Sequence, residues 1–113
     1  MRLQPVAASG LTAAVLLLLA TFAFAQEPEF KIVIENHKFD PAEVTIPANT
    51  KVKLVVENRD ATAEEFESNE LKREKVIAGK SKAVITVGPL KPGRYPFFGE
   101  FKPKTAQGAL VVK

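Results

Sequence analysis

The sequence predicts an all-β domain, a sandwich or a barrel, with at most one short helix near residues 68–75. Apolar residues recur with a period of two in several short runs, which is the pattern of strands that bury one face. Residues that favour turns, chiefly Pro, Gly and Asn, separate these runs. A third observation is length: once a leader is set aside, about 88 residues remain, enough for one core.

Residues 1–25 are predicted to be a cleavable signal peptide. Arg2 supplies a positive start, an apolar run follows, and Ala23-Phe24-Ala25 gives the small-x-small pattern of a cleavage site before Gln26. The apolar run is shorter than the roughly 20 residues that a membrane span requires. We therefore expect a periplasmic domain at 26–113 with no membrane attachment after cleavage. An uncleaved N-terminal anchor is the alternative.

Composition narrows the function of the expected mature domain. Arg2 is the only charge in the leader, so the mature part carries 15 basic and 13 acidic residues. This balance is too weak to indicate a nucleic-acid partner. The chain has no cysteine, although its expected destination is oxidising. The domain must therefore be stable without disulfides, and it can offer no thiolate to a metal.

Five runs are predicted to be strands, and the segments between them agree with that prediction. Residues 47–50 and 89–93 contain the prolines and the asparagine or glycine of turns. Only residues 68–75 look helical, with Ser68 or Asn69 as a cap. The inward-facing residues of the five runs are predicted to be Phe30, Ile32 and Ile34; Val52, Leu54 and Val56; Ala83, Ile85 and Val87; Tyr95 and Phe97; and Leu110 and Val112. A period of two on this scale favours antiparallel strands.

Three segments resemble the cupredoxins. Residues 39–48 resemble the F-x-P-x-x-(I/V)-x-(I/V) segment of the second cupredoxin strand, residues 92–97 resemble P-G-x-Y-x-F, and residues 108–112 resemble the G-x-(L/V)-x-V ending. The resemblance covers nearly the whole mature chain and implies a Greek-key β-sandwich. The Glu65-Phe66-Glu67 stretch is also similar to the cupredoxin-like domain of periplasmic iron-uptake proteins of the EfeO type.

The resemblance also implies that the metal ligands of blue-copper proteins are missing. In that class one ligand comes from an H-x-F stretch and the others from C-x-x-H-x-x-M after the Y-x-F strand. Carried over to this chain, the four positions are occupied by Glu64, Gly99, Lys102 and Thr105. A blue-copper centre needs one thiolate and two imidazoles, so we expect none here.

A different metal site is predicted at the same end of the sandwich. Its candidate ligands are Glu64, Glu67, Glu100 and His37, with Glu65 nearby. One imidazole with several carboxylates suits iron, manganese or copper(II). The resemblance to iron-uptake domains implies an accessory role in iron or copper uptake, with an iron permease or another periplasmic uptake component as partner.

The alternative is a metal-free interaction or structural module. Glu64 is predicted to face inward with Phe66, and Lys102 would then pair with its carboxylate in the vacated metal position. Enzymatic activity is not expected, because neither Ser68 nor Ser81 has a histidine at a supportable spacing and His37 is the only histidine.

Overall fold

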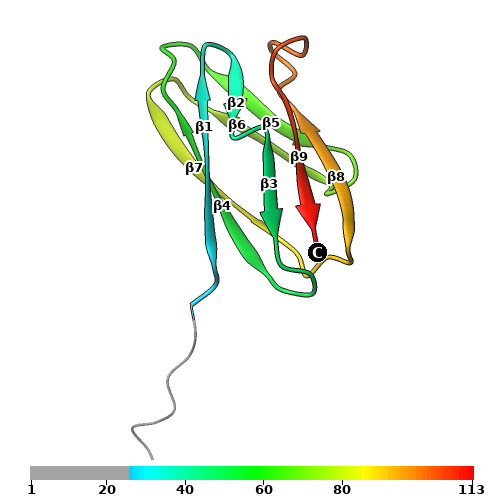
Figure 1. Ribbon diagram of the computed structural model, residues 1–113. Helices are drawn as coiled ribbons and strands as arrows, with labels where there is room; N and C mark the ends of the chain where they lie inside the picture. Colours follow the sequence, from blue (N-terminus) through cyan, green and yellow to red (C-terminus); the bar gives the residue numbers. More distant parts are fainter. Residues whose placement is uncertain (1–25) are drawn as a thin grey trace, which may run out of the picture.

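The computed structural model describes residues 26–113, and the predicted signal peptide lies outside the described residues. Two sheets face each other and enclose the core (Figure 1). No helix in this described part is long and apolar enough to cross a membrane. The all-β prediction is confirmed.

The first sheet has four strands and the second has five. The first, in the order β2-β1-β4-β7, consists of β2 (Lys38–Asp40), β1 (Glu29–Glu35), β4 (Val52–Asn58) and β7 (Ser81–Val87). The second, in the order β3-β9-β8-β5-β6, consists of β3 (Glu43–Ile46), β9 (Gln107–Val112), β8 (Gly93–Phe98), β5 (Glu64–Ser68) and β6 (Arg73–Ile77). Two pairs are parallel, β1 with β4 and β3 with β9, so the prediction of antiparallel strands holds only for the other five pairs. The period of two reports one buried face, but not the direction of the neighbouring strand.

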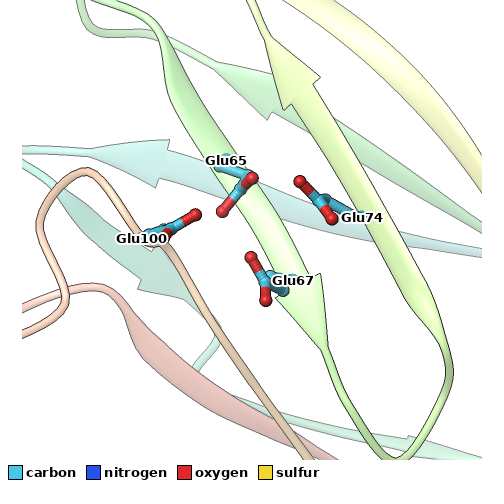
Figure 2. A group of neighbouring side chains, drawn as sticks. All are labelled: Glu65, Glu67, Glu74 and Glu100. Atoms are coloured by element: carbon cyan, nitrogen blue, oxygen red, sulfur yellow. The ribbon is translucent and has the colours of Figure 1, made fainter.

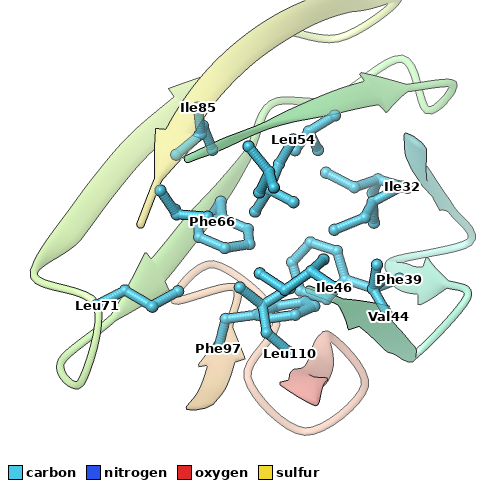
Figure 3. Close-up of a cluster of buried hydrophobic side chains, with 14 of the residues drawn as sticks. Ile32, Phe39, Val44, Ile46, Leu54, Phe66, Leu71, Ile85, Phe97 and Leu110 are labelled. Carbon is cyan, nitrogen blue, oxygen red and sulfur yellow. The ribbon is translucent and has the colours of Figure 1, made fainter. Parts of the chain in front are cut away.

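The core lies between the sheets and contains most of the residues predicted from the period of two, while Phe30, Ala83 and Tyr95 are partly buried and pack against it (Figure 3). Phe66 and Phe97 are fully buried and stack with ring centroids 4.7 Å apart. Phe39 packs edge-on against both, at 6.2 Å from Phe66 and 5.0 Å from Phe97. Aromatic pairs at such separations contribute beyond the area that they bury. β2, β5 and β8 are thus joined through one aromatic cluster.

Residues 68–75 form a hairpin, and the described residues contain no helix there. Ser68 pairs with Arg73 across the β5–β6 hairpin. The Ser68 hydroxyl accepts a hydrogen bond from the Leu71 amide at 3.1 Å and donates one to the Pro96 carbonyl at 2.6 Å. Leu71 is buried against the core. Pairing with β5 and the burial of Leu71 therefore outweigh the local preference for helix.

His37 lies in the tight turn that joins β1 to β2. Asn36 and His37 both have positive φ, 55° and 59°, as the two central residues of a type I′ hairpin require. The Asp60 carboxylate accepts hydrogen bonds from both amides, at 2.8 Å from Asn36 N and 2.9 Å from His37 N. The hydrogen bond from His37 is the main reason that the pKa of Asp60 is lowered. This carboxylate therefore stabilises the turn above its unfolded-state pKa and ceases to do so as the pH falls.

Replacing Asp60 by Ala should destabilise the domain by about 2 kcal/mol, because two turn amides lose a charged acceptor at a partly exposed site. Urea unfolding at pH 7 would measure this loss. Glu29→Ala, an exposed acidic residue on β1, serves as the control and should change stability by less than about 0.5 kcal/mol. Equal effects of the two substitutions would contradict a specific role for Asp60.

Candidate metal site

Four glutamates converge on the outer face of the five-stranded sheet. Glu65 and Glu67 lie on β5, Glu74 on β6 and Glu100 just after β8, and their side chains point toward a common centre (Figure 2). One carboxylate oxygen from each lies within 4.8 Å of the others. Metal–oxygen bonds of about 2.0–2.6 Å place opposite ligands about 4–5 Å apart, so this spacing suits one cation.

Strand register explains the convergence. Glu65 and Glu67 share a face because they are two residues apart. Glu74 is the direct partner of Glu67 across the β5–β6 pair. β5 meets β8 at Glu67 and Phe98, and Glu100 follows that pair by two residues, just beyond the end of β8. Strand pairing therefore positions Glu65, Glu67 and Glu74, and Glu100 joins them from the loop after β8. The whole group is described below as the four-glutamate cluster.

Glu65 is the buried member of this cluster. Glu65 is only 3% exposed, and its Oε1 has no hydrogen-bond partner within residues 26–113. Burial raises the pKa of Glu65 to about 7, helped by the carboxyl groups of Glu67 and Glu74, which can share its proton, and by the charges of Glu67 and Glu100. A buried carboxylate without a donor requires a proton or a cation.

The cluster overlaps only in part with the predicted ligands. The structure brings Glu67 and Glu100 together, but it places Glu64 and His37 outside the group. His37 lies in the β1–β2 turn with its Nδ1 3.7 Å from Asp60 Oδ2. Sequence reasoning missed Glu74, because residues 73–76 are all exposed and so give no alternating signal for a strand.

Glu64 lies on the other face of β5 from Glu65 and is 1% exposed. Its Oε1 accepts hydrogen bonds from the Glu65 amide at 2.9 Å and the Phe101 amide at 3.2 Å, while its buried Oε2 has no partner in the described chain. Lys102 is exposed and makes no ion pair within residues 26–113. The predicted Glu64–Lys102 pair is therefore wrong: a main-chain amide, not an ammonium, reaches the carboxylate.

Comparison with known proteins identifies the family. The family model of the cupredoxin-like domain matches residues 8–112. The chain belongs to the cupredoxin-like domain family. An uncharacterized protein from Rickettsia prowazekii is 48% identical over 84 residues, which make up 74% of this chain and 67% of that protein.

Solved structures show the same cupredoxin fold at low sequence identity. Auracyanin A, a "blue" copper protein from Chloroflexus aurantiacus, matches with a TM-score of 0.67 and 17% identity over 78% of this chain and 100% of its own. The metal-binding domain of the copper(I)-exporting ATPase CopA of Streptococcus pneumoniae matches with a TM-score of 0.64 and 18% identity, over 75% of this chain and 84% of that one.

The cupredoxin-like chain does not offer the donor set of a blue-copper site. It has no cysteine, and Gly99 stands where the resemblance to the C-x-x-H-x-x-M motif of blue-copper proteins places the cysteine ligand. A Cβ on Gly99 would lie 2.7 Å from Glu64 Oε1 and 2.8 Å from the Ala106 Cβ. The Glu64 carboxylate therefore occupies space that a side chain at residue 99 would need. A glutamate at residue 64 and a glycine at residue 99 are therefore sterically compatible with one another.

Gly99→Ala should destabilise the domain by about 1–3 kcal/mol, because the added methyl meets a tethered carboxylate and a buried alanine. Thermal or urea unfolding would measure the loss. Shortening the neighbour in the double variant Glu64→Ser/Gly99→Ala should relieve part of the clash, so the double change should cost less than the sum of the single changes. Strict additivity would contradict the contact.

The raised pKa of Glu65 predicts a pH dependence of stability. Between pH 4.5 and about 7 the folded protein holds a proton on Glu65 that the unfolded chain has released. The metal-free domain should therefore lose stability as the pH rises through this window, by on the order of 1 kcal/mol per pH unit. Urea unfolding from pH 5 to 8, with a chelator present, would measure the slope.

Glu65→Gln should flatten that slope and raise stability at pH 8, because the amide needs no proton. The matched control is Glu70→Gln, an exposed residue of the β5–β6 turn, which should keep the wild-type slope. An unchanged slope in Glu65→Gln would show that Glu65 titrates normally.

Proposed function

We propose that this chain is a periplasmic cupredoxin-like protein without a blue-copper centre, which binds one metal ion at the four-glutamate cluster as an accessory to iron or copper uptake. The observation that carries the proposal is the convergence of three carboxylates on the buried Glu65, whose Oε1 has no hydrogen-bond partner in the described residues. A cation at the centre would contact this oxygen and offset the mutual repulsion of the four groups.

The donor set favours particular ions. All four side chains supply carboxylate oxygen, which suits hard cations such as manganese(II) and oxidised iron better than copper(I), which prefers sulfur. Copper(II) is also compatible with oxygen donors and binds more tightly than most divalent ions. The resemblance of the Glu65-Phe66-Glu67 stretch to EfeO-type domains supports iron as the physiological ion. An iron permease, or another component of uptake in the periplasm, is the proposed partner.

A metal-free interaction module is the second candidate, and one observation favours it. The pKa of Glu65 is raised to about 7 by burial and by the neighbouring carboxyls, so a proton can take the place of a cation in reducing the charge of the cluster. The fold would then serve binding to another protein without a metal.

Catalysis is not part of the proposal. The Ser68 hydroxyl is committed to the Pro96 carbonyl and the Leu71 amide, and the Ser81 hydroxyl donates to the Ala78 carbonyl. His37, the only histidine of the chain, lies beside Asp60 in the β1–β2 turn. None of these groups is arranged as a nucleophile with a general base.

Calorimetric titration of residues 26–113 with iron(II), iron(III), manganese(II) and copper(II) tests the metal proposal. We expect saturable binding of one ion, weakened about tenfold or more by Glu65→Gln, Glu67→Gln or Glu100→Gln. Glu70→Gln, which removes one charge from the neighbouring turn, should leave the affinity within about twofold. Equal losses in all four variants would indicate non-specific attraction, and no binding by the wild type would favour the metal-free module.

A further inference from the structure

We propose that Glu64 is a positioning residue for the metal site: its carboxylate ties the Glu100 segment to β5 and so sets the separation of Glu65 and Glu100. This inference rests on the proposed metal-binding function. Glu64 itself lies outside the four-glutamate cluster, on the opposite face of β5.

The hydrogen bonds of Glu64 reach the backbone of both candidate ligands. Its Oε1 accepts from the amide of Glu65 and from the amide of Phe101, which belongs to the peptide that follows Glu100. One oxygen atom therefore joins the main chain at two of the four cluster positions. No other side-chain hydrogen bond among residues 26–113 connects β5 with the segment 99–106.

The sheet itself does not hold Glu100 in place. The β5–β8 pairing is limited to Glu67 and Phe98, and the chain then turns away because the Gly99 amide donates to the Ala106 carbonyl. Glu100 is exposed and lies beyond the end of β8. The strand pairing ends at Phe98. The Glu64 carboxylate supplies a new link to β5 at Phe101, the residue that follows Glu100.

The space for this link exists because residue 99 is glycine. Glu64 Oε1 would lie 2.7 Å from a Cβ at that position, and its Cδ would lie 2.8 Å from it. The carboxylate is enclosed, at 1% residue exposure, so it cannot swing to the outer face and bind the metal directly. Positioning is the role that this geometry leaves to it.

The test compares two substitutions of Glu64 by calorimetric titration of residues 26–113 with manganese(II) and with iron(II). Glu64→Gln keeps a side-chain oxygen for the Phe101 amide and should hold the dissociation constant within about threefold of the wild type. Glu64→Leu removes the acceptor and should weaken binding tenfold or more, in the range typical of residues that orient metal ligands. Lys104→Gln, on the same segment, is the control and should bind as the wild type does.

A second arm separates positioning from general stability. In the Glu100→Gln background, Glu64→Leu should weaken binding by less than about threefold further, because the ligand that Glu64 positions has already been lost. A tenfold loss in both backgrounds would overturn the inference, since it would mean a general structural effect. If Glu64→Leu does not fold, as judged by circular dichroism, Glu64→Gln decides alone.

Loss of binding in Glu64→Gln as large as in Glu65→Gln would overturn positioning by making Glu64 a ligand. Failure of the wild type to bind manganese(II) or iron(II) would overturn this inference. The proposed function would fail with it only if iron(III) and copper(II) did not bind either. If the wild type binds metal but Glu64→Leu binds as tightly as the wild type, or Glu64→Gln binds as weakly as Glu65→Gln, only the inference about Glu64 is overturned.

Discussion

The end of the sandwich that carries the candidate site depends on the buried carboxylate of Glu64. Its Oε1 accepts hydrogen bonds from the amides of Glu65 and Phe101, and these bonds link β5 to the segment after β8. The segment is otherwise closed on itself, with the Gly99 amide donating to Ala106 and the Ala106 amide donating to Lys102. Burying a polar group is costly unless it is hydrogen-bonded, and the two hydrogen bonds of Oε1 also join the loop to β5.

Two consecutive glutamates of β5 meet very different surroundings because successive residues of a strand point to opposite faces. Glu64 enters the interior and receives amide hydrogen bonds, whereas Glu65 faces three other carboxylates on the outer face. Burial near like charges raises the pKa of Glu65 to about 7, so its ionised form is destabilised in the metal-free protein. Such a preformed but unfavourable charge arrangement is what a cation stabilises on binding.

The same strand anchors the site to the core. Phe66, between Glu65 and Glu67, points inward and stacks on Phe97. Phe39 packs edge-on against both rings from the opposite sheet (Figure 3). Three of the four glutamates therefore lie on paired strands, two of them on β5 with its buried inner face, and only Glu100 lies on a loop. Sites on sheet strands are held more rigidly than sites on loops, which explains why a separate tether to the Glu100 segment matters.

By itself, the sequence determined the all-β class, the inward-facing residues of five strands and the absence of any thiolate ligand. These properties follow from local periodicity and from composition, and the buried residues Ile32, Leu54, Phe97 and Leu110 agree with them. It also placed Glu67 and Glu100 near one another through the family resemblance. Only the tertiary structure decided the strand directions, the hairpin at residues 68–75 and the membership of Glu74 in the cluster.

The reasons are physical. Glu74 enters the cluster through its cross-strand pairing with Glu67, a non-local contact on a strand with no buried alternation. Lys102 is adjacent to Phe101, and nothing in the sequence distinguishes an ammonium partner for Glu64 from a main-chain amide. Every residue carries an amide of the same kind, so which one reaches a buried carboxylate depends on the course of the folded chain and not on the identity of any side chain.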